Sequence, residues 1–184
     1  MSNNRIERVV DLGCGDWQFS RLIDWGTADY IGADVVVSVV EHNSARFGRG
    51  GVSFQLVRDD GSDLPRGDLL LCKDVLQHMA RPSIERFIAD VLPRYRYALL
   101  TNCVEPIDSL NVDIEPGAFR PLDLRLAPFE VPATAVYDFT GRAVYSIRLH
   151  ARLPGWRKLV LLVNNSTPQS IPTPSRPFDG LVGR

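Results

Sequence analysis

Val9-Val-Asp-Leu-Gly-Cys-Gly-Asp-Trp17 is a short apolar run that carries one acid, Asp11, and ends in a turn with two glycines. A run this short and this apolar is typical of a strand buried on both faces of a parallel sheet. In an open parallel sheet the turn after such a strand borders the crevice where ligands bind. Gly13 and Gly15 permit backbone angles and a close ligand approach that a Cβ would obstruct. The segment therefore predicts a ligand-binding turn.

Four further apolar runs follow within the first hundred residues, at 30–35, 52–57, 69–73 and 98–102. Helical spacing appears between them, at 19–23 and over two turns at 84–92, where Pro93 stops it. Because strands alternate with helices, the pattern predicts βαβ units. The expected fold is a three-layer, doubly wound, Rossmann-like α/β domain.

The pattern changes after residue 102. The segment 103–140 contains five prolines, too many for a long crossover helix, so we expect a long irregular segment. Long connections of this kind are usually functional, and we expect this one to recognise a substrate. The runs 145–149 and 158–163, with Pro154-Gly155 between them, predict an antiparallel C-terminal hairpin. The sheet would then hold about seven strands, mainly parallel. Residues 1–165 are expected to form one domain, and the proline-rich residues 166–184 a flexible tail.

Composition narrows the class of protein. With 45% hydrophobic and 23% charged residues the 184-residue chain matches an ordinary soluble globule. We find neither an apolar run long enough for a membrane span nor a secretion signal at the start, so the expected location is the cytoplasm. The net charge of −1 lacks the basic excess that accompanies nucleic-acid binding, although residues 141–184 carry +6. Three widely spaced cysteines, at 14, 72 and 103, predict neither a disulfide framework nor a metal site.

The glycine turn differs from a dinucleotide fingerprint. Gly-x-Gly-x-x-Gly would place glycine where Gln18 stands, and the Asp11 carboxylate would repel a pyrophosphate. A carboxylate at this position suits a cationic or zwitterionic ligand better. The simpler alternative is that Asp11 only accepts hydrogen bonds from neighbouring backbone amides.

The segment resembles the first motif of the class I S-adenosylmethionine-dependent methyltransferases, acid-x-Gly-x-Gly, and further motifs follow in that family's order over residues 8–102. The resemblance implies a methyl donor whose methionine part is bordered by Asp11, Gly13, Cys14 and Gly15. It implies that Asp34, followed by Val35, holds the ribose hydroxyls, and that Asp59 or Asp60 approaches the adenine. Turn chemistry explains Asp59 and Asp60 almost equally well. The family often has a third glycine where Trp17 stands, so the indole is expected to form a wall against the cofactor or, alternatively, to pack in the core.

The segment Lys73-Asp-Val-Leu-Gln-His78 resembles the family's region after the fourth strand, where groups facing the acceptor usually lie. Lys73 is expected to border the cofactor, and Asp74 or His78 to act as a general base. A packed, hydrogen-bonded His78 is the alternative. Asn111, Asp113 and Glu115 alternate, so an extended chain would aim all three at one side, toward a cationic acceptor or a divalent metal.

The sequence thus predicts methyl transfer from S-adenosylmethionine, leaving S-adenosylhomocysteine, to a small-molecule acceptor rather than to nucleic acid. The alternative from another class is a catalytically inactive module that keeps the fold and binds the cofactor or a partner. The acceptor and the oligomeric state stay open.

Overall fold

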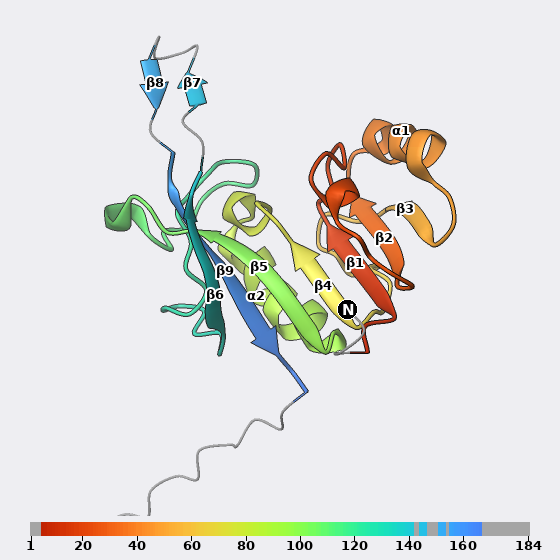
Figure 1. Cartoon of the computed structure of the whole chain (residues 1–184). Coiled ribbons are helices and arrows are strands. Elements are labelled where there is room, and N and C mark those ends of the chain that lie inside the picture. Colours follow the sequence, from red (N-terminus) through yellow and green to blue (C-terminus); the bar gives the residue numbers. More distant parts are fainter. Residues whose placement is uncertain (1–4, 142–143, 147–150, 154, 167–184) are drawn as a thin grey trace, which may run out of the picture.

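The computed structural model describes residues 5–141, 144–146, 151–153 and 155–166 (Figure 1). A seven-stranded sheet in the order β3-β2-β1-β4-β5-β9-β6 runs through the molecule. The first five of these strands in the chain pair in parallel, and β9 pairs antiparallel with β5 and β6. The predicted fold class is confirmed: a mainly parallel, Rossmann-like sheet with an antiparallel end.

The parallel strands match the apolar runs of the sequence. They are β1 (Arg8–Leu12), β2 (Asp29–Asp34), β3 (Val52–Leu56), β4 (Leu69–Cys72) and β5 (Tyr97–Cys103). Alternate residues of β4 and β5 point to opposite faces of the sheet. Leu70 and Leu100 are fully buried in the larger core cluster on one face, whereas Leu71 and Leu99 are only half-buried on the other.

The antiparallel end is built from different residues than predicted. The partner of β9 (Arg157–Asn164) is β6 (Thr134–Thr140), which belongs to the segment expected to be irregular. The short strands β7 (Val144–Ser146) and β8 (Ala151–Leu153) form a separate two-stranded sheet, which projects from one end of the molecule (Figure 1). The predicted pairing of 145–149 with 158–163 is therefore wrong. Strand β6 has apolar residues at every second position, Ala135, Tyr137 and Phe139, but the five prolines of the segment led to the prediction of irregular structure.

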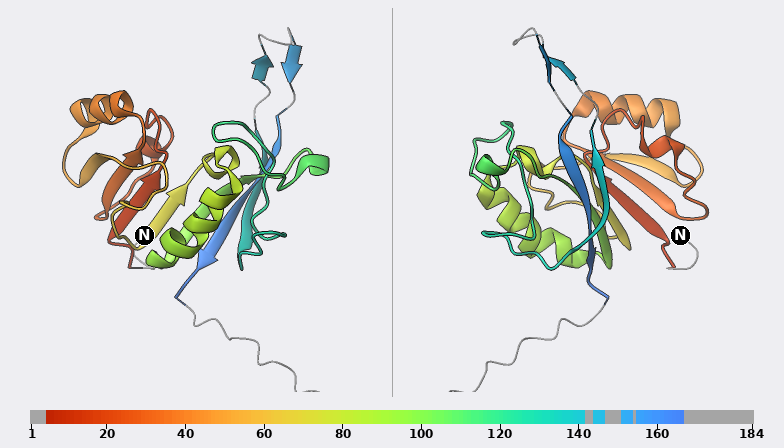
Figure 2. Two further views of the ribbon diagram at one scale, coloured as in Figure 1. Left: turned by 180° about the vertical axis from the view of Figure 1, so that it is seen from behind. Right: turned by 60° about the vertical axis from the view of Figure 1, so that its left-hand side comes forward.

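Helices cover the sheet unevenly. Helix α2 (Arg81–Arg86) continues as a π-helical segment, Phe87–Val91, and a 3-10 turn, Leu92–Arg94, and this run lies against one face of the sheet (Figure 2). Its buried side chains Ile84, Phe87 and Val91 join the larger core cluster with β4, β5 and β9. Helix α1 (Val37–Phe47) follows β2. Other 3-10 turns span Ser20–Leu22, Leu76–His78 and Ile107–Ser109.

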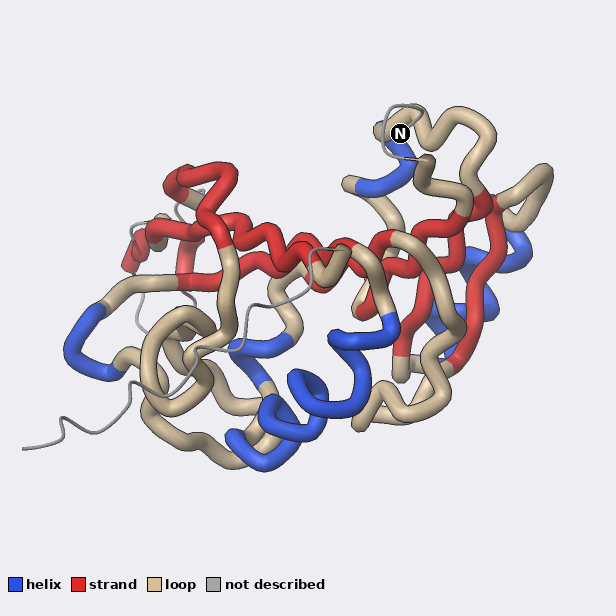
Figure 3. Tube along the Cα trace, turned by 90° about the horizontal axis from the view of Figure 1, so that it is seen from below, coloured by secondary structure: helices blue, strands red, loops and turns tan. Residues whose placement is uncertain are grey.

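The opposite face is covered only in part. A smaller cluster that includes Trp17, Trp25 and Tyr30 packs over β1 and β2. The connection from β1 to β2 contains a single 3-10 turn in place of a full helix. In the described part of the chain no helix lies over β4, β5 and β9 on this side (Figure 3).

No helix in the described ranges is both long and apolar enough to cross a membrane. Of the predicted tail 166–184, residues 167–184 lie outside the described part of the structure.

Candidate functional site

The glycine turn after β1 has the geometry that its sequence predicts. Gly13 and Gly15 both have positive φ angles, +73° and +53°. The Gly13 and Cys14 amides donate to the Ala33 carbonyl of β2, at 2.7 and 3.2 Å. A Cβ on Gly13 would overlap the Val75 side chain, whereas a Cβ on Gly15 would meet nothing within 4 Å. The turn is thus anchored to the sheet at Gly13 and faces open space at Gly15.

Asp34 ends β2 directly beside this turn. Its Oδ2 accepts a hydrogen bond from the Gly15 amide and its Oδ1 one from the Val36 amide, both at 3.0 Å. The side chain is nearly buried, with the residue 8% exposed. Each carboxylate oxygen keeps a second lone pair that can accept a further hydrogen bond. Val35, the next residue, is half-exposed at 51%.

Asp11 lies in a buried hydrogen-bond network rather than against backbone amides. Its Oδ2 accepts from Ser20 Oγ at 2.6 Å and from the Tyr30 hydroxyl at 2.5 Å. Burial raises the pKa of Asp11, and these two hydrogen bonds only partly oppose the shift. Trp25 Nε1 in turn donates to the Ser20 carbonyl at 3.1 Å. Asp11 therefore fixes the 3-10 turn that partly covers this face of the sheet.

Cys14 and Asn43 complete the turn. Burial, followed by the charges of Asp11 and Asp34, raises the pKa of the Cys14 thiol to about 12, so the thiol is neutral. The fully buried Asn43 of α1 donates from Nδ2 to the Gly15 carbonyl at 2.7 Å. Sequence reasoning missed Asn43, because no local motif points to a hydrogen bond that spans 28 residues.

Trp17 lies in the core rather than at the cofactor crevice. Its ring centroid is 5.6 Å from that of Tyr30, 5.0 Å from Phe47 and 5.3 Å from Phe54. The residue is only 8% exposed and has φ +58°, and it does not line the cavity described below. The indole packs between Phe47 of α1 and the sheet residues Tyr30 and Phe54. The expectation of an indole wall against the cofactor therefore has no support in this geometry.

Asp59 and Asp60 lie in an exposed loop after β3, outside the cavity. Asp60 Oδ1 accepts from the Ser62 amide at 3.0 Å, and hydrogen bonding to Ser62 lowers its pKa. Arg94 fastens the same loop by donating to the carbonyls of Ser62 and Leu64. This arrangement is what the alternative of turn chemistry predicts for Asp60.

The end of β4 carries an ion-paired acid. Asp74 has φ +59°, and its two carboxylate oxygens accept from Lys73 Nζ at 2.9 Å and from Lys158 Nζ at 2.7 Å. Burial alone would raise the pKa of Asp74, but the hydrogen bonds from Lys158 and Lys73 outweigh it and the net pKa lies below its usual value. A carboxylate held ionised in this way is a weak proton acceptor.

His78 projects from the 3-10 turn after β4 and is exposed. Its Nδ1 lies 2.8 Å from the Ala118 carbonyl. Because a carbonyl only accepts hydrogen bonds, Nδ1 carries the proton, and Nε2 is the nitrogen able to take one up. The ring also contacts Phe119, at 5.7 Å between centroids. His78 does not line the cavity.

The alternating residues of the segment after β5 do not share one side. Asn111 is buried, and its side chain bonds to the Asp123 amide and to the Asp123 and Ala127 carbonyls at 2.9–3.0 Å. Asp113 is exposed and accepts from the Arg81 amide at the start of α2, at 2.8 Å. The prediction that Asn111, Asp113 and Glu115 share one side is therefore wrong, because the Asn111 side chain points inward and holds the segment through these hydrogen bonds. Within the described residues no group of three His, Cys, Asp or Glu could hold a metal ion.

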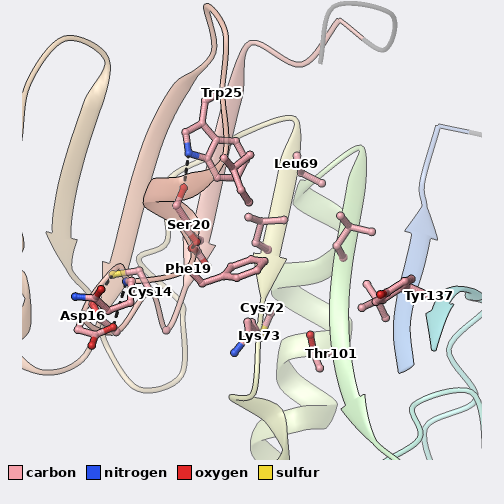
Figure 4. A pocket seen from close by; sticks show the side chains of 18 of the residues that line it. Cys14, Asp16, Phe19, Ser20, Trp25, Leu69, Cys72, Lys73, Thr101 and Tyr137 are labelled. Carbon is pink, nitrogen blue, oxygen red and sulfur yellow. Dashed lines mark hydrogen bonds between the residues drawn. The ribbon is translucent and has the colours of Figure 1, made fainter. Parts of the chain in front are cut away.

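A cavity of about 890 Å³ opens on the partly covered face of the sheet (Figure 4). One end of the cavity is formed by the glycine turn and the ends of β1 and β4. We call it the polar end, and its residues are Asp11, Gly13, Cys14, Gly15, Asp16 and Lys73. The remainder crosses β4, β5, β9 and β6. We call it the apolar trough, and its residues are Leu69, Leu71, Leu99, Thr101, Tyr137, Phe139 and Val160. Phe19, Ile23 and Trp25 form a wall beside both parts.

The structure thus brings together five of the predicted cofactor residues at the polar end, and it places Asp34 in direct contact with them through Gly15. The other predicted cofactor residues do not line the cavity: Asp34 itself, Val35, Asp59, Asp60 and Trp17. The lining of the trough could not be predicted, because sequence alone does not show that the face would lack a covering helix.

No family model matches the chain, and no curated protein matches it in sequence. Solved structures do match it in shape. TehB from Haemophilus influenzae superposes with a TM-score of 0.61 at 14% identity, covering 85% of this chain and 57% of its own. An S-adenosylmethionine-dependent methyltransferase from Methanosarcina mazei gives a TM-score of 0.58 at 13% identity, covering 88% of this chain and 94% of its own. Human N-acetylserotonin methyltransferase, solved in complex with S-adenosylmethionine, gives 0.60 at 12% identity, covering 91% of this chain and 50% of its own.

These likenesses cover 85–91% of the chain, and the mainly parallel sheet with an antiparallel end agrees with the fold class that the sequence predicts. The chain therefore has the fold of the class I S-adenosylmethionine-dependent methyltransferases.

Proposed function

We propose that the protein transfers a methyl group from S-adenosylmethionine to a small-molecule acceptor. The observation that carries the proposal is the junction of Gly15 and Asp34: a glycine turn open to a cavity, directly bonded to a carboxylate at the end of the neighbouring strand. The open space beside Gly15 suits close approach by a ligand. Asp34 has spare lone pairs for two hydroxyl donors, such as those of a ribose.

The residues present fit the methyl donor at this place. Asp34 would hold the ribose, and Gly13, Cys14 and Gly15 would border the methionine part. Asp16 and Lys73 at the polar end offer opposite charges to a zwitterionic amino acid group. When bound, the cofactor supplies a methyl group on a sulfonium sulfur.

The protein's own residues contribute chiefly by aligning the acceptor with the methyl donor. Placing an acceptor atom in line with a methyl group contributes about 7–11 kcal/mol in effective-molarity terms. A hydroxyl or ammonium acceptor must also lose a proton. In this proposal Asp74 positions Lys73 and Lys158 rather than acting as the base. His78 does not line the cavity, so its Nε2 would receive the proton through an intervening water.

The alternative, a module that binds the cofactor without catalysis, is favoured by one observation: neither candidate base is placed to act directly. His78 does not line the cavity, and both Asp74 oxygens accept hydrogen bonds from lysines. Turnover with an identified acceptor separates the two proposals, while cofactor binding is common to both.

Calorimetric titration of S-adenosylhomocysteine tests the cofactor site. Asp34→Asn keeps the side chain's shape but removes its charge, and we expect the affinity to fall at least about tenfold, on the scale of a charge-assisted hydrogen bond. The matched control is Asp29→Asn at the other end of β2, an exposed acid 3.8 Å from Arg8. Equal affinity in the two variants, or no binding to the unaltered protein, would overturn the proposal.

A further inference from the structure

The proposed function uses only the polar end of the cavity and leaves the apolar trough without a role. The trough is an open part of the sheet face, with Leu71, Leu99 and Val160 each half-buried. Its outer side chain Tyr137, on the edge strand β6, is 63% exposed. Apolar side chains gathered in a concave, open site usually mark a place where a ligand or partner binds.

The strand register makes the polar end and the trough one continuous surface. Asp11 of β1 lies opposite Leu71 of β4, which lies opposite Leu99 of β5. In the adjoining row Thr101 of β5 lies opposite Val160 of β9, which lies opposite Tyr137 of β6. Four strand spacings separate β1 from β6, so the surface is about 19 Å wide. A molecule lying on it would reach the polar end from the trough.

Charge is divided between the two parts. Asp11, Asp16 and Lys73 belong to the polar end, whereas the trough contains no Asp, Glu, Lys, Arg or His. The wall residues Phe19, Ile23 and Trp25 are uncharged as well. An ionised ligand group would lose its hydration in the trough without gaining a partner, which is costly. The trough therefore selects an uncharged body.

The size of the cavity favours a small molecule over a protein segment. About 890 Å³ falls within the usual range for small-molecule sites, and the wall and β6 bound the space on two sides. Thr101 and Tyr137 each offer a hydroxyl in an otherwise apolar lining, the usual composition of such a site.

We infer that the apolar trough is the acceptor site, and that the acceptor is an uncharged, largely apolar small molecule whose reacting oxygen or nitrogen lies at the polar end. This inference rests on the proposed function for the identity of the reaction. It goes beyond it by naming the substrate class and the residues that select it.

The test uses N-phenyl-1-naphthylamine, an uncharged apolar probe whose fluorescence rises in apolar sites, and S-adenosylhomocysteine. Val160→Trp fills the trough, and we expect it to weaken probe binding at least tenfold while leaving S-adenosylhomocysteine affinity within twofold. The matched control is Leu162→Trp, two residues along β9 on the same face and half-buried but outside the cavity. It should bind both ligands as the unaltered protein does. Tyr137→Arg, a change on an exposed edge strand, tests the trough without risk to the core and should also weaken probe binding.

Each other outcome has a stated meaning. Equal probe binding in Val160→Trp and Leu162→Trp, or no probe binding to the unaltered protein, overturns the inference. Displacement of the probe by S-adenosylhomocysteine overturns it too, because the trough would then belong to the cofactor. Probe binding that declines as the protein concentration rises would show that a second copy covers the face, which also contradicts it. Loss of S-adenosylhomocysteine binding alone, with the probe retained, would instead count against the proposed function.

Discussion

At the residue scale, the two glycines of the turn differ in what they tolerate. A side chain at Gly15 meets only the backbone preference against positive φ, whereas one at Gly13 also overlaps Val75. Sequence reasoning treats the two alike, because a Gly-x-Gly pattern does not show which neighbour faces each position.

We expect Gly13→Ala to destabilise the fold by about 2–5 kcal/mol, the sum of a left-handed backbone penalty and overpacking. Gly15→Ala should cost only about 1–2 kcal/mol, from the backbone alone. Chemical denaturation measures both. The double variant Gly13→Ala/Val75→Ala makes room for the new Cβ. Relative to Val75→Ala alone, it should therefore lose only the part of the unfolding free energy that comes from the backbone. Additive losses in the double variant would contradict this account.

Asp74 provides a second prediction at this scale. Its folded pKa lies below its ordinary value, so its ion pairs stabilise the folded state above the unfolded pKa of about 4, and this stabilisation is lost as the pH falls through the folded pKa. Asp74→Asn should therefore be less stable than the unaltered protein at pH 7, and the difference should shrink below pH 4. Urea denaturation at pH 7, 5 and 3.5 measures it. A difference independent of pH would mean that Asp74 acts through packing rather than charge.

At the element scale, the segment between β5 and β6 is held by long-range contacts rather than by regular structure. Asn111 makes three hydrogen bonds to Asp123 and Ala127, and the two to Asp123 are buried. The Leu122 amide donates to the Cys103 carbonyl. Composition correctly indicated a segment without a long helix, but it also concealed β6 at its end. No local pattern could have paired Asn111 with residues 12 and 16 positions away.

We expect Asn111→Ala to lower the free energy of unfolding by about 3 kcal/mol, because it leaves a buried amide and two carbonyls without partners. Val112→Ala, at a neighbouring residue that is 54% exposed, should change it by less than about 0.5 kcal/mol. Thermal and chemical denaturation compare the two. A small effect at Asn111 would show that water replaces its partners and that the segment is fastened elsewhere.

At the scale of the whole molecule, the sequence predicted the parallel half of the sheet well. Runs such as 69–73 and 98–102 have apolar side chains on both faces, one in the core and the other in the trough, and this leaves a plain signal in composition. The uncovered face was not predictable, because the sequence does not show that the connection from β1 to β2 would contain a single 3-10 turn. Among the site residues, Asp34 and the glycine turn meet as expected, since the carboxyl ends of neighbouring parallel strands converge. Trp17 could equally be a wall or a core residue until its neighbours Phe47 and Phe54 were placed.

The most direct test of cofactor binding at the Gly15–Asp34 junction is an amide NMR titration of the protein with S-adenosylhomocysteine. The Gly15 and Val36 amides donate to the two Asp34 oxygens, so they report any new partner of that carboxylate. We predict that these two amides and that of Gly13 shift most, while the amides of β6 stay in place. Shifts confined to β6 and β9, or no shifts at saturating ligand, would contradict the account.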